Sequence, residues 1–207
     1  MNNYTYPDGF AKLSAAAPLV LQDIRYAASY NFIGRPVDGY EAPVAYLALE
    51  AAEALRKASE DAWNQGYLLK VFDAYRPQRA VDHFNRWVQD AKDTKMKAWF
   101  YPDVDKAELY ALDFLGRRSS HSKGGAVDLT LFDPSTGRDA DMGGSFDFFG
   151  PISHYAWEGL TPEQAENRRI LRDLMTAQGF EPLDSEWWHF RLVDEPFPNT
   201  WFDFVIR

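Results

Sequence analysis

The feature that most constrains the fold is an acidic residue, Asp128, inside a run whose composition is typical of a buried β-strand. In "AVDLTLF" the apolar residues Val127, Leu129 and Leu131 alternate with other positions. A solvent-facing acid is expected in a turn, yet Asp128 stands among these three residues inside the run. A buried carboxylate is costly unless a partner holds its charge. The sequence therefore predicts a sheet that carries a partnered acidic group on one face.

Hydrophobic periodicity predicts an α+β fold around that strand. Apolar residues at helical spacing alternate along the chain with short stretches of strand-like composition, in the order helix 44–66, strand 67–72, helix 78–91, strand 126–132, helix 161–179 and strand-like segment 180–193. The last helix has the capping-box residues Thr161 and Gln164 at its start. A further short helix is expected from Asp103 to Phe114. We predict one domain over residues 1–207, with a small antiparallel or mixed sheet flanked by helices.

Composition limits the classes of function. A chain of 207 residues with 46% hydrophobic content can bury one sizeable core. Its net charge of -9 disfavours nucleic acids and anionic membranes as partners, because phosphate binding relies on Lys and Arg. No apolar run approaches the roughly 20 residues of a spanning helix, and the start "MNNYTYPDGF" does not resemble a signal peptide, so a cytoplasmic location is expected. The sequence contains no cysteine, so any metal must be bound by His, Asp or Glu.

Two short motifs hold the candidate metal ligands. His121 and Asp128 flank a Gly-Gly turn that leads into the strand, so one side chain comes from a loop and the other from the sheet face. In "SEWWHF", Glu186 and His189 are three residues apart, which places them on opposite faces of a regular strand. A bulge or a tight turn is needed to bring them together. The remaining histidines, His83 and His154, are interpreted as surface or hydrogen-bonding residues.

If these groups converge, their chemistry is that of a hydrolase. His121, Asp128 and His189 supply the three protein ligands of a catalytic zinc, one per chain, on the sheet face. Glu186 then remains free as a general base beside the zinc-activated water. Arg76, at the end of a strand in "DAYRP", can stabilise the oxyanion formed during peptide-bond hydrolysis.

A purely structural interpretation of the same residues stays open at this point. Both spacings are common by chance, and the helical HExxH signature is absent. Asp128 could instead pair with Lys123 or an arginine. Glu186 and His189 could lie at a strand surface beside tryptophans that belong to the core.

Longer motifs resemble those of the VanX-type zinc D-alanyl-D-alanine dipeptidases, within a D,D-peptidase group that also includes VanY-type carboxypeptidases. The resemblance covers almost the whole chain and rests on motifs in family order: "IRYAASYNFIGRPVDGYE", "DAYRPQRAV", "SSHSKGGAVDLTL", "DMGGSFDFF", "SEWWHF" and "DEPFPNTWFDF". It implies zinc ligation by His121, Asp128 and His189. It also implies that Glu186 is the general base and acid and that Arg76 polarises the scissile carbonyl.

The same resemblance implies the substrate-binding residues. Asp147 matches the partner of the dipeptide's free ammonium, Ser119 and Ser120 match positions that contact the substrate backbone or carboxylate, and Tyr26 and Tyr40 match pocket residues. Each has a structural alternative: a loop-stabilising acid for Asp147, turn hydrogen bonds for the serines and ordinary packing for the tyrosines. The acid-rich "DPSTGRDAD" after the zinc aspartate departs from the family in a segment of variable length, which leaves the substrate range open.

The expected function is hydrolysis of D-Ala-D-Ala, either to remove the cell-wall precursor bound by vancomycin-type antibiotics or to recover D-alanine. One alternative is a D,D-carboxypeptidase acting on longer peptidoglycan stem peptides, and another is a non-catalytic zinc-binding module. The aromatic C-terminal segment "FPNTWFDFVIR" is expected to pack on the domain's own core or on a second subunit. The sequence does not indicate an oligomeric state.

Overall fold

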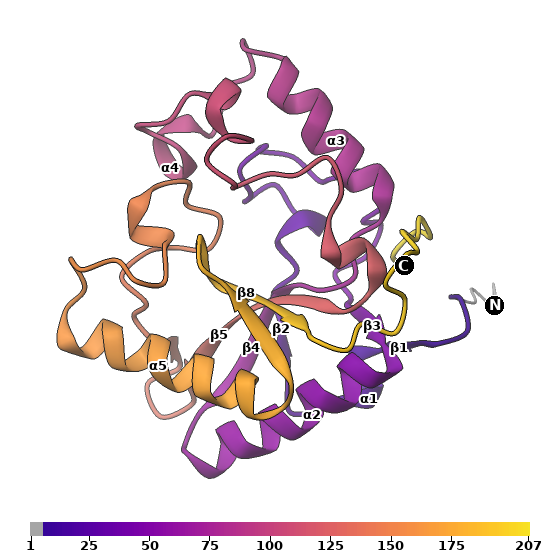
Figure 1. Cartoon of the computed structure of the whole chain (residues 1–207), viewed down its shortest axis with the longest axis vertical. Helices are drawn as coiled ribbons and strands as arrows, with labels where there is room; N and C mark the ends of the chain where they lie inside the picture. The colour runs from indigo at the N-terminus through magenta and orange to yellow at the C-terminus, as the bar shows by residue number, and fades with distance from the viewer. Residues whose placement is uncertain (1–5) are drawn as a thin grey trace.

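A six-stranded, largely antiparallel sheet forms the centre of the structure, a computed structural model that describes residues 6–207 (Figure 1). Five strands run in the order β2-β4-β5-β8-β7, and β6 pairs with β5 outside this path. Only β2 and β4 are parallel. The strands are β2 (Leu21–Gln22), β4 (Leu68–Asp73), β5 (Ala126–Asp133), β6 (Arg138–Asp139), β7 (Phe180–Leu183) and β8 (Glu186–Leu192). A separate antiparallel pair joins β1 (Phe10–Lys12) to β3 (Tyr46–Ala48).

Two long helices cover one side of this sheet, and a third lies on the opposite side (Figure 1). The covering helices α2 and α5 contact each other as well as the strands. The helices are α1 (Leu13–Ala16), α2 (Leu49–Asn64), α3 (Gln78–Gln89), α4 (Lys97–Phe100) and α5 (Pro162–Ala177), with short 3-10 helices η1 (Arg25–Ala27), η2 (Lys106–Glu108), η3 (Ser120–Lys123) and η4 (Pro151–Ser153). The face of the sheet that α2 and α5 do not cover lies toward α3, and it is called the open face below.

The central strand β5 forms as its composition predicts, and it has two different faces. Val127, Leu129 and Leu131 are fully buried in the hydrophobic core, and α5 packs against this strand. Asp128 is also buried, on the alternate side. Since α2 and α5 occupy the apolar side, the carboxylate of Asp128 faces the side where α3 and its neighbouring loops lie.

The α+β class and most predicted elements are confirmed, with two corrections. The helix expected from residue 44 begins only at Leu49, because residues 46–48 pair with β1 as strand β3. The helix expected from Asp103 to Phe114 is wrong: only the 3-10 turn η2 forms there. Asp113 has a positive φ of 62°, which no right-handed helix accommodates. The capping box of Thr161 and Gln164 is present at the start of α5.

Among the described residues, no helix combines the length and apolar composition that crossing a bilayer requires. The expectation about a signal peptide concerns the first ten residues, of which 1–5 lie outside the described part of the chain. The C-terminal segment packs on its own chain: Phe197, Phe202 and Phe204 contact the hydrophobic core.

Candidate active site

Three side chains from two strands and a 3-10 helix meet on the open face of the sheet. Asp128 on β5 and His189 on β8 are direct register partners. His121 lies in η3, and the chain then turns through Gly124 into β5. Gly124 has a φ of 81°, and a Cβ at this position would come within 2.4 Å of the Phe10 ring. Only glycine fits this turn, which folds His121 back over the strand that it precedes.

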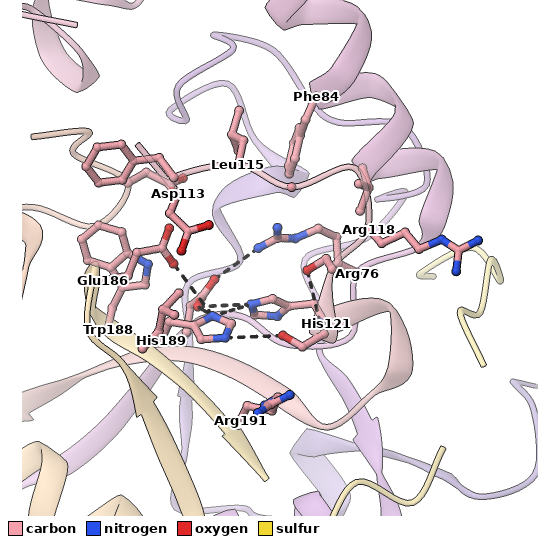
Figure 2. A pocket seen from close by; sticks show the side chains of 18 of the residues that line it. Arg76, Phe84, Asp113, Leu115, Arg118, His121, Glu186, Trp188, His189 and Arg191 are labelled. Carbon is pink, nitrogen blue, oxygen red and sulfur yellow. Dashed lines mark hydrogen bonds and ion pairs between the residues drawn. The ribbon is translucent and has the colours of Figure 1, made fainter. Parts of the chain in front are cut away.

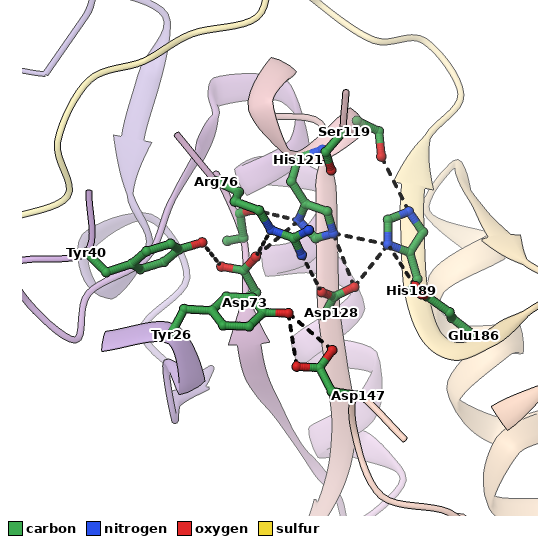
Figure 3. Close-up of polar contacts among 12 residues, drawn as sticks. Tyr26, Tyr40, Asp73, Arg76, Ser119, His121, Asp128, Asp147, Glu186 and His189 are labelled. Carbon is green, nitrogen blue, oxygen red and sulfur yellow. Dashed lines mark hydrogen bonds and ion pairs between the residues drawn. The ribbon is translucent and has the colours of Figure 1, made fainter. Parts of the chain in front are cut away.

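The potential donor atoms of these residues form a small triangle (Figure 3). His189 Nδ1 lies 3.0 Å from Asp128 Oδ1, His121 Nε2 lies 3.2 Å from the same oxygen, and the two ring nitrogens are 3.1 Å apart. Ligands bound to tetrahedral zinc at ordinary bond lengths are roughly 3.3 Å apart. The residues present therefore fit a zinc ion bound by two imidazoles and one carboxylate.

Hydrogen bonds and burial prepare both rings for this role. His121 Nδ1 lies 2.7 Å from the Ala74 carbonyl oxygen, so it carries the proton and leaves Nε2 free for a metal. His189 Nε2 lies 3.4 Å from Ser120 Oγ, on the side of the ring away from the triangle. Burial lowers the pKa of His189, which favours the neutral ring that metal binding requires.

The carboxylate of Asp128 is held in its charged form. Burial alone would raise its pKa, but the adjacent His121 and His189 rings outweigh burial and lower the pKa below the ordinary aspartate value. Arg76 adds to this effect, with Nη2 at 3.3 Å from Asp128 Oδ2. This carboxylate is therefore available as an anionic ligand.

Arg76 is fixed by a residue that the sequence analysis did not single out. Its Nε donates to Asp73 Oδ2 at 2.8 Å, and Asp73 Oδ1 accepts a hydrogen bond from the Tyr40 hydroxyl at 2.6 Å. Asp73 ends β4 and is the register partner of Asp128, next to an irregularity in the ladder. Its signal in the sequence is an acid directly after the apolar strand 67–72, a weaker signal than the position of Asp128 inside an apolar run.

The irregularity needed to bring Glu186 near His189 is present in β8. On β7, Leu183 pairs with Glu186, but Pro182, the residue before Leu183, pairs with Phe190. The register between β7 and β8 therefore shifts between Pro182 and Leu183. Glu186 Oε2 consequently lies 3.9 Å from His189 Nδ1. Burial, followed by the negative charges of Asp128 and Asp147, raises the pKa of Glu186 well above its ordinary value. A carboxyl group with a raised pKa beside this candidate metal site is suited to proton transfer.

These groups line one cavity of about 400 Å³ (Figure 2). Arg76, His121, Asp128, Glu186 and His189 form one part of its wall. The segment 113–118, which includes the Asp113 of positive φ, forms another part. Sequence reasoning assigned no site role to this segment. The volume is within the range of sites for small ligands.

Asp147 lies in the same cavity, from the loop between β6 and α5. It is only 5% exposed and has a φ of 62°, an uncommon conformation for a residue other than glycine. The Tyr26 hydroxyl lies 3.1 and 3.0 Å from its two carboxylate oxygens. Burial, and then the negative charge of Asp128, raises the pKa of Asp147 well above its ordinary value. The positive charge of a ligand group would compensate both for the burial of this carboxylate and for its repulsion by Asp128.

A buried arginine holds the loop that carries Asp147. Arg168 on α5 donates to three backbone carbonyl oxygens, of Met142 at 2.7 Å, Ile152 at 2.7 Å and His154 at 2.8 Å. These carbonyls lie on both sides of Asp147 in the sequence. The long loop after β6 is therefore ordered by α5.

Of the other predicted site residues, three line the cavity and one does not. Ser119 and Ser120 line the cavity, and Ser119 Oγ also accepts the His121 backbone N–H at 3.2 Å. Tyr26 lines the cavity, whereas Tyr40 lies behind Asp73 and is absent from the cavity wall. The nitrogen Nδ1 of His83 accepts the Asp38 backbone N–H at 3.1 Å.

Comparison with known proteins gives the family context of this cavity. The family model described as D-Ala-D-Ala dipeptidase matches residues 8–207. The chain belongs to this peptidase family. It is 43% identical over 199 residues to a D-alanyl-D-alanine dipeptidase of Enterococcus faecium, with 96% of this chain and 98% of the relative covered. It is 45% identical over 184 residues to the D-alanyl-D-alanine dipeptidase of Streptomyces coelicolor, with 89% and 91% covered.

A solved structure with a similar chain path is a vancomycin-resistance D,D-pentapeptidase VanY variant in complex with Zn(II). The similarity covers 76% of this chain and 78% of that chain, at 16% sequence identity and a TM-score of 0.43.

Proposed function

We propose that this member of the dipeptidase family is a zinc-dependent enzyme that hydrolyses D-Ala-D-Ala to two molecules of D-alanine. The observation that carries the proposal is the placement of a three-residue metal triangle, Glu186 and the buried acid Asp147 around one small cavity. The names of the relatives, D-alanyl-D-alanine dipeptidases, support the substrate.

His121, Asp128 and His189 would hold the zinc ion. When bound, zinc supplies Lewis-acid activation of a water molecule and of the scissile carbonyl. Glu186 takes a proton from the attacking water and delivers it to the amine nitrogen as the C–N bond breaks. The raised pKa of Glu186 favours its proton-carrying form between these two transfers.

Arg76 provides the positive charge for the developing oxyanion. Arg76 lines the cavity and is only 9% exposed, so water screens its charge little. The bond to Asp73 fixes the guanidinium before substrate arrives, and a preorganised charge needs no reorganisation during the reaction.

Asp147 would bind the free ammonium of the dipeptide. Its carboxylate is buried beside Tyr26, and a charge-assisted bond to an ammonium replaces the lost contact with water. An N-acylated or longer peptide has no ammonium at this position and would leave the acid unpaired, which is costly in a buried site. Selectivity for dipeptides over stem peptides follows.

The zinc requirement is tested by removal and return of the metal. Treatment with a chelator is expected to abolish release of D-alanine from D-Ala-D-Ala, and one equivalent of zinc per chain should restore it. His121→Ala should bind less than one zinc per chain, measured by elemental analysis after dialysis, because two protein ligands hold the ion poorly. His154→Ala is the matched control, since this side chain is exposed. Full activity of the chelated protein would refute the proposal.

A further inference from the structure

The C-terminal segment makes a backbone bridge between the segments that carry Arg76 and His121. The Phe202 N–H donates to the Ser122 carbonyl at 2.8 Å, and the Phe202 carbonyl accepts the Gln78 N–H at 3.0 Å. Ser122 follows His121 directly, and Gln78 is two residues after Arg76. One residue of the C-terminal segment thus joins the segment that follows Arg76 to the segment that carries His121.

The same segment caps the helix that begins just after Arg76. The first N–H groups of α3 have no partners inside the helix, and the preceding Pro77 has no side-chain acceptor. Asp203 Oδ1 accepts the Arg79 backbone N–H at 2.8 Å, in the place of a local cap. The Asp203 carboxylate also accepts from Nε and Nη2 of Arg79, at 2.9 and 3.0 Å. A negative charge at this end of α3 is favourable for the helix dipole.

The residue before Arg76 is held by the C-terminal segment as well. The Tyr75 ring stacks on Phe204 with centroids 3.9 Å apart and planes inclined by 7°. The Tyr75 hydroxyl donates to the Phe204 carbonyl oxygen at 3.1 Å. Residues 202–204 therefore contact the chain immediately before Arg76 and at the first turn of the helix after it.

We infer that residues 202–204 set the position of the Arg76 guanidinium, with Asp203 as a positioning residue for the reaction. The inference rests on the proposed role of Arg76. Asp73 orients the guanidinium through its side chain, whereas the C-terminal segment fixes the backbone from which Arg76 projects. A displacement of about 1 Å in a catalytic group can reduce the rate by up to 10²-fold, so a remote cap can influence turnover.

The first test compares Asp203→Ala with Asp203→Asn. We expect Asp203→Ala to lower kcat for D-Ala-D-Ala by roughly tenfold, with KM within twofold and zinc content unchanged. The amide oxygen of Asp203→Asn can still accept the Arg79 N–H, so this variant should recover most of the lost kcat. Asp38→Ala is the matched control, because Asp38 is an exposed acid that pairs with Arg86 near the other end of α3.

Thermal unfolding separates positioning from general stability. The Arg79 and Asp203 side chains are 44% and 46% exposed, and exposed ion pairs contribute little to folding. Because one capping hydrogen bond is also lost, the unfolding temperature of Asp203→Ala should fall by only a few degrees. A lower unfolding temperature with unchanged kcat per bound zinc would overturn the inference.

A double-mutant cycle tests whether Asp203 acts through Arg76. In the Arg76→Ala background, Asp203→Ala should cause no further loss of kcat, because the group that it positions is gone. Independent, additive losses would contradict the inference and leave the proposed function intact. If Arg76→Ala itself retained kcat, the proposed catalytic role of Arg76 would fail, and the positioning inference with it.

Discussion

Replacement of Glu186 by alanine is expected to lower kcat for D-Ala-D-Ala by about 10³-fold, with zinc still bound at one ion per chain. The carboxyl group lies next to the three candidate ligands without being one of them, and its Oε2 is 3.9 Å from His189 Nδ1. The variant therefore loses the proton carrier and keeps all three candidate ligands. Steady-state release of D-alanine, with zinc measured on the same samples, checks both parts of this expectation.

A matched control for this prediction lies on the neighbouring strand. Glu181 also lines the cavity, but it comes from β7 and pairs with Arg191. Glu181→Gln should keep kcat within a few-fold of the wild type. Wild-type turnover in Glu186→Ala would contradict the assignment of Glu186 as the general base. Loss of zinc would instead show that Glu186 belongs to the metal site.

Replacement of Asp147 by asparagine is expected to lower kcat/KM for D-Ala-D-Ala by about 100-fold. The amide has nearly the same shape as the carboxylate but no charge with which to pair a buried ammonium. The ratio of kcat/KM for D-Ala-D-Ala to that for N-acetyl-D-Ala-D-Ala should fall by a similar factor, because the acetylated peptide gains nothing from the carboxylate. Competition between the two peptides, followed by free D-alanine and by N-acetyl-D-alanine, measures this ratio directly.

Asp139→Asn provides the comparison for the loss of one negative charge. Asp139 is in β6, just before the loop that carries Asp147, and pairs with Lys70 outside the cavity. The Asp139→Asn substitution should leave the selectivity ratio unchanged. If Asp147→Asn also left the ratio unchanged, the role of Asp147 would be limited to holding its loop and Tyr26.

Sequence patterns predicted the parts of the site that depend on local structure. The alternating apolar residues around Asp128 identified the strand, and the three-residue spacing of Glu186 and His189 indicated that these two residues converge only if β8 is irregular. Both inferences work because the side-chain period of a strand is two residues, so any departure from it requires a visible change in register.

The contacts that sequence patterns missed depend on long-range packing. Asp73 acquires its role only because β4 pairs with β5 and places it opposite Asp128. The expected helix from Asp103 to Phe114 has suitable composition, yet the chain unwinds there to bring residues 113–118 over the cavity. Such tertiary contacts override local propensity, and the spacing of apolar residues in the sequence does not reveal them.

The central claim is tested most directly by release of free alanine from three substrates by the zinc-loaded protein: D-Ala-D-Ala, L-Ala-L-Ala and N-acetyl-D-Ala-D-Ala. We expect D-Ala-D-Ala to be cleaved far faster than the acetylated peptide, because the buried acid pairs with a free ammonium, and L-Ala-L-Ala serves as the control for stereochemistry. Comparable cleavage of the acetylated peptide would contradict the dipeptidase assignment and favour a carboxypeptidase. No release from any of the three, with zinc bound, would contradict the catalytic assignment and favour a zinc-binding module.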